Sequence, residues 1–376
     1  MKKLALFIIS ILLVISAVLI INKPWIKRPQ EPTKPYPYYS EEVTFQNVQA
    51  KVTLNGTLTL PSKEGNFSVV ILITGSGPQN RDEYIDGHRP FLVISDYLTK
   101  RGIAVLRYDD RGYGGPINDY WKATSIDLAS DVESAILYLK TRKEINKNKI
   151  GLLGHSEGGS IAPIVASKSE DVSFIVLLAG SGMKGDKSLI YQTELTLRAS
   201  GISEKEIEQQ VRIISEICEI VSNSPDVHAL RSTLTQHATQ TIKEYELKVP
   251  GHKLKRPDHM TEEEYILSEV DRLSSPWWVY FIKSDPAIVL EKVTCPVLAL
   301  NGEKDVQVTP KENLAIIKNA LVKGGNMNVT VKELPDLNHL FQECDTGSLN
   351  EYHKIRQTIS PLVLKEMSNW ILNQVN

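Results

Sequence analysis

The chain has 376 residues, 41% of them hydrophobic and 23% charged, which is enough apolar material for a large core and excludes a mainly disordered protein. Lysine and arginine total 43, and aspartate and glutamate total 45. The resulting net charge of −2 gives no electrostatic reason to expect a nucleic-acid partner. Three widely separated cysteines favour neither a disulfide framework nor a thiolate zinc site.

The chain begins with a basic and then strongly apolar segment. Lys2 and Lys3 precede an apolar run from Leu4 to Ile21 that only two serines interrupt. A helix of this length would reach about 27 Å, close to the roughly 30 Å hydrocarbon core of a bilayer. No small-residue cleavage pattern follows Ile21, and Trp25 stands where an interfacial aromatic is expected. We therefore expect residues 1–22 to be a retained anchor with the folded domain extracytoplasmic; the alternative is a signal peptide that is cleaved before secretion.

Residues 23–42 follow as a proline-rich stretch, with four prolines between positions 29 and 40. This composition is typical of an extended tether rather than a helix. We expect the folded domain to begin at residue 43.

The folded part alternates between predicted strands and helices. Residues 43–60 alternate in hydrophobicity, and Asn55-Gly56 is the expected hairpin turn. Residues 69–73 and 103–108 are continuous apolar runs, as in strands buried on both faces of a parallel sheet. Further strands at 149–153, 173–178, 295–300 and 328–334 alternate with helical patterns. The pattern predicts an α/β fold with a doubly wound, mostly parallel sheet.

A long polar segment interrupts this alternation. Residues 183–286 contain no strand-like run, and apolar residues at helical spacing, from Ile207 to Val221, predict a helix within it. We expect a helical cap inserted between two parts of the core, residues 43–182 and 287–376, and lying over the strand ends where open α/β sheets bind ligands.

The strongest chemical signal is Gly154-His155-Ser156-Glu157-Gly158 between a predicted strand and a predicted helix. The glycines allow a tight turn that holds the Ser156 hydroxyl clear of its own backbone. A serine nucleophile needs a base and an orienting acid. Asp305 and His339 follow later strands in the loops at their carboxyl ends, in the chain order serine, aspartate, histidine. Glu303 competes with Asp305 for the acid role, and Asp336 is a weaker candidate.

An oxyanion hole requires two N–H donors close to the serine. We expect the amide of Glu157, directly after the nucleophile, and the amide of Ser76 in the Thr74-Gly75-Ser76-Gly77 loop, with Gly77 as the next choice. A phosphate-binding loop is rejected because no Gly-Lys-Ser/Thr follows. Nearby charged clusters at 81–83 and 109–111 are expected to hold loops by ion pairing.

These motifs resemble those of α/β-hydrolase-fold serine esterases of bacteria. The resemblance rests on residues 75–83 (GSGPQNRDE), 108–114 (YDDRGYG), 154–158 (GHSEG) and 295–305 (CPVLALNGEKD), and it covers about residues 43–375. It implies Ser156, Asp305 and His339 as a catalytic triad, short-chain carboxylic esters as substrates, and no metal or organic cofactor. Thr74 departs from the histidine that many members of the superfamily carry before this glycine.

Two alternatives stay open at this stage. The same residues suit a thioesterase, an acyltransferase or a serine peptidase, although 376 residues leave no room for the β-propeller of a prolyl-oligopeptidase-type enzyme. A catalytically silent, membrane-tethered binding protein would have a different kind of function, and the complete set of triad residues argues against it.

Overall fold

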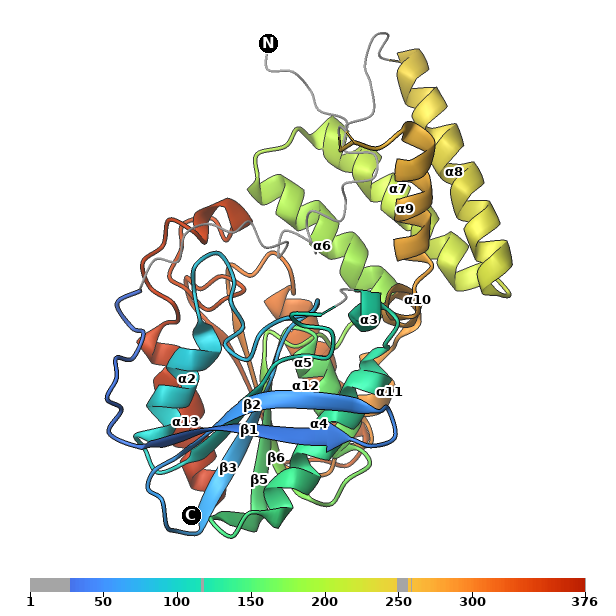
Figure 1. Ribbon diagram of the computed structural model, residues 1–376. Helices are drawn as coiled ribbons and strands as arrows, with labels where there is room; N and C mark the ends of the chain where they lie inside the picture. The colour runs from blue at the N-terminus through green and yellow to red at the C-terminus, as the bar shows by residue number, and fades with distance from the viewer. Residues whose placement is uncertain (1–27, 116–117, 249–255, 258, 376) are drawn as a thin grey trace.

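A mixed eight-stranded sheet forms the centre of the computed structural model, which describes residues 28–115, 118–248, 256–257 and 259–375 (Figure 1). The strand order is β1-β2-β4-β3-β5-β6-β7-β8. β1 pairs with β2, and β2 with β4, in antiparallel fashion, and all other neighbours are parallel. The strands are β1 (Tyr39–Asn47), β2 (Val52–Leu60), β3 (Phe67–Ile73), β4 (Ala104–Tyr108), β5 (Ile145–His155), β6 (Val172–Leu178), β7 (Val297–Gly302) and β8 (Val329–Leu334).

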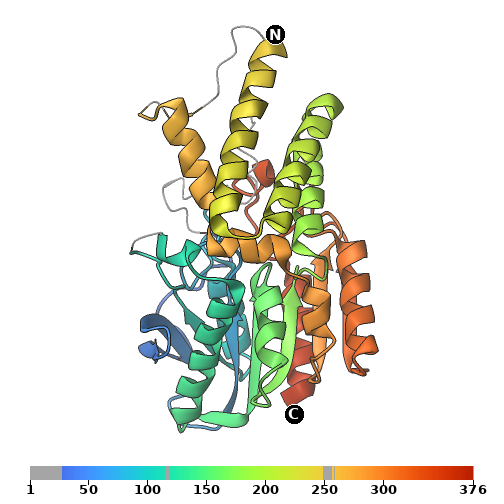
Figure 2. The ribbon, with the colours of Figure 1, turned by 90° about the vertical axis from the view of Figure 1, so that its right-hand side faces the viewer.

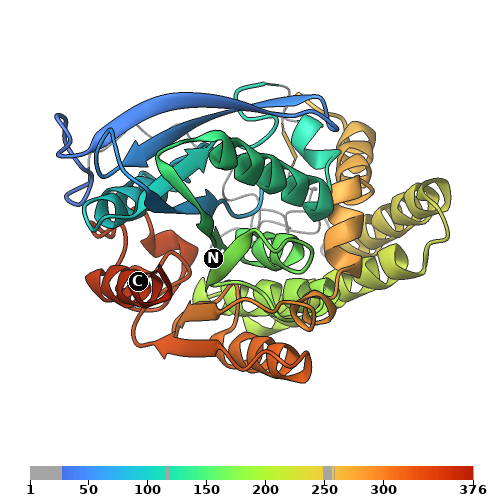
Figure 3. The same cartoon turned by 90° about the horizontal axis from the view of Figure 1, so that it is seen from below.

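Helices cover both faces of this sheet, so the predicted α/β architecture is confirmed. α4 (Ser125–Thr141), α5 (Gly158–Ala166) and α12 (Pro310–Lys323) lie on one face, and α2 (Pro90–Thr99) and α13 (Pro361–Val375) lie on the other (Figure 3). The continuous apolar runs of β3 and β4 are explained by this double cover, because every residue of β4 and the last five of β3 are buried.

The first hairpin turns at a different place from the one that the sequence predicts. The turn connects Asn47 to Val52, and Asn55-Gly56 lies inside β2, where Gly56 faces Val43. A Cβ atom on Gly56 would approach the Arg107 carbonyl oxygen of β4 to 2.6 Å. Gly56 is therefore needed because two strands approach each other closely at this position. The Asn-Gly dipeptide alone does not distinguish such a contact from a hairpin turn.

Six helices lie between β6 and β7 in the part of the chain that the structure describes, and five of them, α6 to α10, fall within residues 183–286. They are α6 (Gly185–Ala199), α7 (Glu204–Asn223), α8 (Val227–Lys248), α9 (Glu262–Leu273), α10 (Pro276–Lys283) and α11 (Pro286–Leu290). α6 to α9 project from the carboxyl-end side of the sheet, and α10 lies at their base (Figure 2). Ile207, Ile214, Cys218 and Val221 of the predicted stripe on α7 are buried.

The proline-rich segment differs from the expected free tether, because its described part is bound to the core. The buried Arg28 guanidinium donates to four backbone carbonyls, those of Asp86, Gly87, His353 and Ile355. Gln30 exchanges hydrogen bonds with the backbone near residue 359. Composition does not reveal these contacts, because they depend on two distant loops.

The predicted anchor, residues 1–22, lies outside the described residues. In the part of the chain that the structure describes, no helix combines the length and the apolar character that a membrane span requires.

Candidate active site

Ser156 occupies a strained turn between β5 and α5. Its φ is 53°, in the left-handed region that non-glycine residues rarely adopt. Flanking glycines are required because a Cβ atom at Gly154 would collide with the Gly158 carbonyl, and one at Gly158 would collide with that of Ile73. This tight, strained turn places Ser156 at the edge of the sheet, as in a nucleophile elbow.

Asp305 and His339 meet at this same edge of the sheet. His339 Nδ1 lies 2.8 Å from Asp305 Oδ2, and both side chains are buried. The other oxygen, Asp305 Oδ1, accepts the amides of Gln307 at 2.8 Å and Val308 at 2.9 Å. These donors fix the carboxylate, and the carboxylate in turn fixes the imidazole ring.

The two alternative acids have different partners. Glu303 is exposed and accepts the Asp336 amide. Asp336 itself forms an exposed ion pair with Lys304. Neither carboxylate is the hydrogen-bond partner of the His339 ring.

The Gly75-Ser76-Gly77 loop lies directly beside the nucleophile, since a Cβ atom on Gly75 would be 3.2 Å from Ser156 Cβ. The Gly75 amide donates to Glu83, and the Gly77 amide donates to the Tyr120 hydroxyl. Among the described residues, by contrast, the amides of Ser76 and Glu157 have no hydrogen-bond acceptor. The two amides predicted to form an oxyanion hole are thus left available.

A partly buried carboxylate anchors the same loop. Asp110 accepts the Thr74 hydroxyl at 2.8 Å and the Gln79 amide at 2.9 Å. Burial raises the pKa of Asp110 well above its usual value. Thr74, the departure from the family pattern, therefore has a structural partner here.

The neighbouring charged clusters hold loops, as the sequence predicts. Arg81 pairs with Asp109 at 2.6 Å, and Arg111 pairs with Asp131 at 2.7 Å.

The side chain of Glu157 points away from solvent and joins the core to the helices above it. Its carboxylate accepts the Ser125 hydroxyl at 2.7 Å, the Tyr120 hydroxyl at 3.3 Å and the Trp277 indole N–H of α10 at 3.0 Å. Burial raises the pKa of Glu157, although these donors oppose the rise. The residue after the nucleophile thus connects the elbow to α10.

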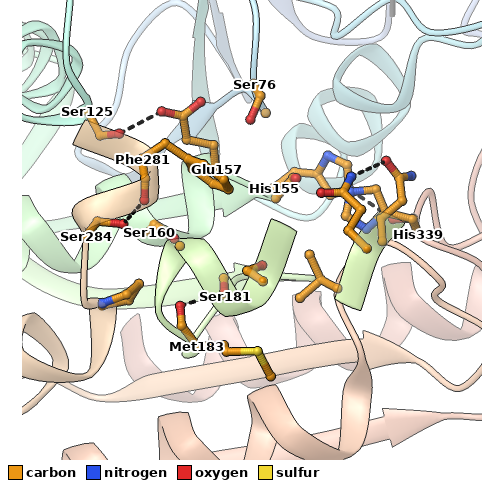
Figure 4. A pocket seen from close by; sticks show the side chains of 18 of the residues that line it. Ser76, Ser125, His155, Glu157, Ser160, Ser181, Met183, Phe281, Ser284 and His339 are labelled. Carbon is orange, nitrogen blue, oxygen red and sulfur yellow. Dashed lines mark hydrogen bonds between the residues drawn. The ribbon is translucent and has the colours of Figure 1, made fainter. Parts of the chain in front are cut away.

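A cavity of about 380 Å³ opens beside Ser156 and His339. Met183 from the segment before α6 and Phe281 from α10 face it, together with Ser160 and Ser181 (Figure 4). On the far side of His339 the lining continues through Leu340, Tyr352 and His353. The aromatic helix α10 contributes two rings to the wall, those of Tyr280 and Phe281, while Trp277 and Trp278 are buried.

Several residues of the site are not indicated by the sequence patterns. Glu83, Tyr120 and Trp277 contact the residues on either side of Ser156 from positions 72, 37 and 120 residues away in the sequence. Glu83 lies in the GSGPQNRDE motif, which was a usable signal, whereas nothing in the local sequence distinguishes Tyr120. Within the described ranges, no group of three or more histidine, cysteine, aspartate or glutamate side chains could hold a metal ion.

Comparison with known families and sequences finds hydrolases. Residues 132–246 match the family model for the C-terminal region of BAAT / acyl-CoA thioester hydrolases. Esterase EstD of Thermotoga maritima is 24% identical over 337 residues, which are 89% of this chain and 70% of that protein. Acyl-coenzyme A thioesterase 3 of Mus musculus is 24% identical over 181 residues, 46% of this chain and 41% of the thioesterase.

Solved structures agree at the level of the fold. A putative dipeptidyl aminopeptidase IV from Bacteroides ovatus aligns with a TM-score of 0.52 and 12% identity, over 90% of this chain and 36% of the peptidase. The acylaminoacyl peptidase of Pyrococcus horikoshii aligns with a TM-score of 0.50 and 12% identity, over 89% and 41%. This chain therefore spans well under half of either peptidase.

Proposed function

We propose that this chain, a member of the α/β hydrolases, is a serine hydrolase that cleaves carboxylic esters, with short acyl chains preferred, through an acyl-enzyme on Ser156. The observation that carries the proposal is the 2.8 Å contact between His339 and Asp305, both buried beside the strained Ser156 elbow. A purely structural role would not explain why a buried histidine, its carboxylate partner and a serine with a left-handed backbone conformation all lie at one cavity.

In this mechanism His339 takes the proton from the Ser156 hydroxyl as its oxygen attacks the ester carbonyl. Asp305 holds the ring in the tautomer that presents Nε2 to the serine and stabilises the imidazolium that forms. The developing oxyanion accepts hydrogen bonds from the backbone amides of Ser76 and Glu157. His339 then protonates the leaving alcohol, and water activated by the same histidine hydrolyses the acyl-enzyme.

The charges of the cavity support a neutral ester over an acyl-CoA thioester. Its lining contains Asp86 and Asp285 but, among the described residues, no lysine or arginine. Coenzyme A carries several phosphate charges, which a protein normally meets with basic side chains. The thioesterase relatives keep an acyl-CoA substrate as the second candidate.

The direct test uses p-nitrophenyl acetate and butyrate with the full chain and its Ser156→Ala variant. We expect the variant to lose at least about a thousandfold in kcat/KM. Ser160→Ala, a second serine of the cavity wall, is the matched control and should stay close to the parent rate. Full activity in Ser156→Ala would sink the assignment, and faster turnover of acyl-CoA than of any ester would favour the second candidate.

We also propose that residues 1–22 are retained as a membrane anchor, with the catalytic domain on the extracytoplasmic side. Ile21 and Arg28 are seven residues apart, at most about 25 Å when fully extended. Arg28 is clamped to the carbonyls of Asp86 and His353, which both line the cavity. The anchor would thus hold the cavity mouth near the lipid surface, where exposed Lys354 and Arg356 favour anionic headgroups.

A lengthened chain tests this arrangement. Thirty glycine and serine residues inserted between Asn22 and Lys23 should lower the rate on a vesicle-dissolved ester by about tenfold, because effective concentration falls with linker length. The rate on water-soluble p-nitrophenyl acetate should not change. Equal rates on the vesicle-dissolved ester, or release of the parent chain from membranes by high salt, would contradict the proposal.

A further inference from the structure

A second histidine, His155, lies buried beside the catalytic loops with both ring nitrogens engaged. Nδ1 is 2.9 Å from Glu83 Oε1, and Nε2 is 2.9 Å from the backbone carbonyl oxygen of His339. Only 5% of the His155 side chain and 1% of the Glu83 side chain are exposed. The ring centroids of His155 and His339 lie 4.8 Å apart. Figure 4 shows the two side chains next to one another.

Both partners of His155 are hydrogen-bond acceptors. The His339 carbonyl can only accept, and an ionised Glu83 carboxylate also only accepts. The same oxygen, Glu83 Oε1, accepts the Gly75 amide at 2.9 Å. A neutral imidazole has one N–H and could satisfy only one of its two acceptors, so with Glu83 ionised the arrangement requires His155 in its doubly protonated form.

The pair thereby joins three pieces of the site. Gly75 belongs to the loop that carries the Ser76 amide, His155 immediately precedes Ser156, and the His339 carbonyl belongs to the loop of the base. We propose that the buried Glu83–His155 ion pair is a positioning device that locks the oxyanion loop, the nucleophile and the base into one geometry only while His155 is protonated. This inference rests on the proposed function, because it assigns positioning residues to that same site.

The electrostatics agree with a protonated ring. Burial alone lowers the pKa of His155, but the Glu83 carboxylate, its hydrogen bond and the His339 carbonyl outweigh burial and raise the pKa above the usual 6.5. Asp305 acts in the same direction. The His339 ring, 4.8 Å away, is a further titratable group that faces His155. The lock is therefore complete below about pH 6.5 and is lost as the pH rises through the raised pKa of the folded state.

The variant Glu83→Gln tests the lock. Its carboxamide oxygen can still accept the Gly75 amide, but the charge that keeps His155 protonated is gone, so burial lowers the pKa of the ring. We expect the alkaline loss of kcat to begin at lower pH than in the parent chain, with KM within about twofold. Near pH 6 the variant should recover most of the parent kcat, which a merely structural defect would not do.

The control is Glu291→Gln, a surface carboxylate that pairs with Lys323. It should leave the pH profile of kcat unchanged. A Glu83→Gln profile that coincides with the parent profile would overturn the inference while leaving the proposed function intact. Failure of the parent chain to react with a fluorophosphonate at Ser156 would instead overturn the proposed function.

A measurement on the parent chain keeps the inference testable if Glu83→Gln does not fold. Selective ¹⁵N-histidine labelling distinguishes a doubly protonated ring from a neutral ring by the shifts of its two nitrogens. His155 should show two protonated nitrogens at pH 6, assigned by the signal that disappears in His155→Gln. A neutral His155 ring at this pH would overturn the inference.

Discussion

Hydrophobic residues have different roles in the sheet and in the helices that cap it. In the sheet, strands buried on both faces fix the loops at their carboxyl ends, and these loops hold Ser156, Asp305 and His339. In the cap, α6 to α9 are amphipathic or polar helices that pack mainly on one another and on α10. Among the described residues of the cap, only α10 has a side-chain hydrogen bond to the elbow, from the Trp277 indole N–H to the Glu157 carboxylate.

This difference suggests a division of labour. A rigid, doubly covered sheet holds reacting groups to the tolerances that catalysis requires. A helical layer with fewer contacts to the sheet can vary in shape and supplies walls such as Met183 and Phe281. We therefore expect changes in the sheet loops to alter kcat, and changes in the cap to alter stability and KM.

The largest effect should come from the acid in the sheet. Asp305→Asn keeps the size of the side chain but no longer selects the His339 tautomer or stabilises its cation, so kcat should fall by about 10³- to 10⁴-fold with little change in KM. Steady-state hydrolysis of p-nitrophenyl acetate measures the loss. Asp336→Asn, at an exposed carboxylate of the neighbouring loop, is the control. If Asp336→Asn lost as much activity as Asp305→Asn, the acid would be misassigned.

An intermediate effect is expected within the cap. Ile214 is 1% exposed on the buried side of α7, and Ile214→Ala should cost about 2–5 kcal/mol of cap stability. Hydrogen exchange should show faster opening of α7 and α8, and KM for butyrate esters should rise more than kcat falls. Glu219→Ala, on the exposed side of the same helix, should change neither quantity. Equal weakening of the sheet amides would show that cap and core unfold as one unit.

The smallest effect concerns the bond between the two regions. Trp277→Phe removes the N–H that Glu157 accepts and should destabilise the fold by about 1–3 kcal/mol. Because burial already raises the pKa of Glu157, removing a donor to the charged form should raise it further. The destabilisation should therefore be present at neutral pH and shrink as Glu157 becomes protonated at lower pH. Thermal unfolding between pH 4.5 and 8 measures it, and a pH-independent loss would contradict this origin.

The sequence by itself determined the sheet and the candidate triad positions, because the signals involved are local. Continuous apolar runs predict strands covered on both faces, and a serine between glycines after such a strand predicts a strained turn. Asp305 and His339 followed because parallel strands present their carboxyl ends at one edge. The predicted turn at Asn55-Gly56 was wrong because the same dipeptide also suits a close approach to a neighbouring strand.

Only the tertiary structure decided which buried polar groups meet. Glu83 and His155 are 72 residues apart, Glu157 and Trp277 are 120 apart, and Arg28 and Ile355 are 327 apart. Such contacts leave no periodic trace in the sequence, because each requires only one donor and one acceptor to face each other after folding. These pairs are favoured because burying an unpaired polar group costs free energy. That cost arises only when the folded core surrounds the group.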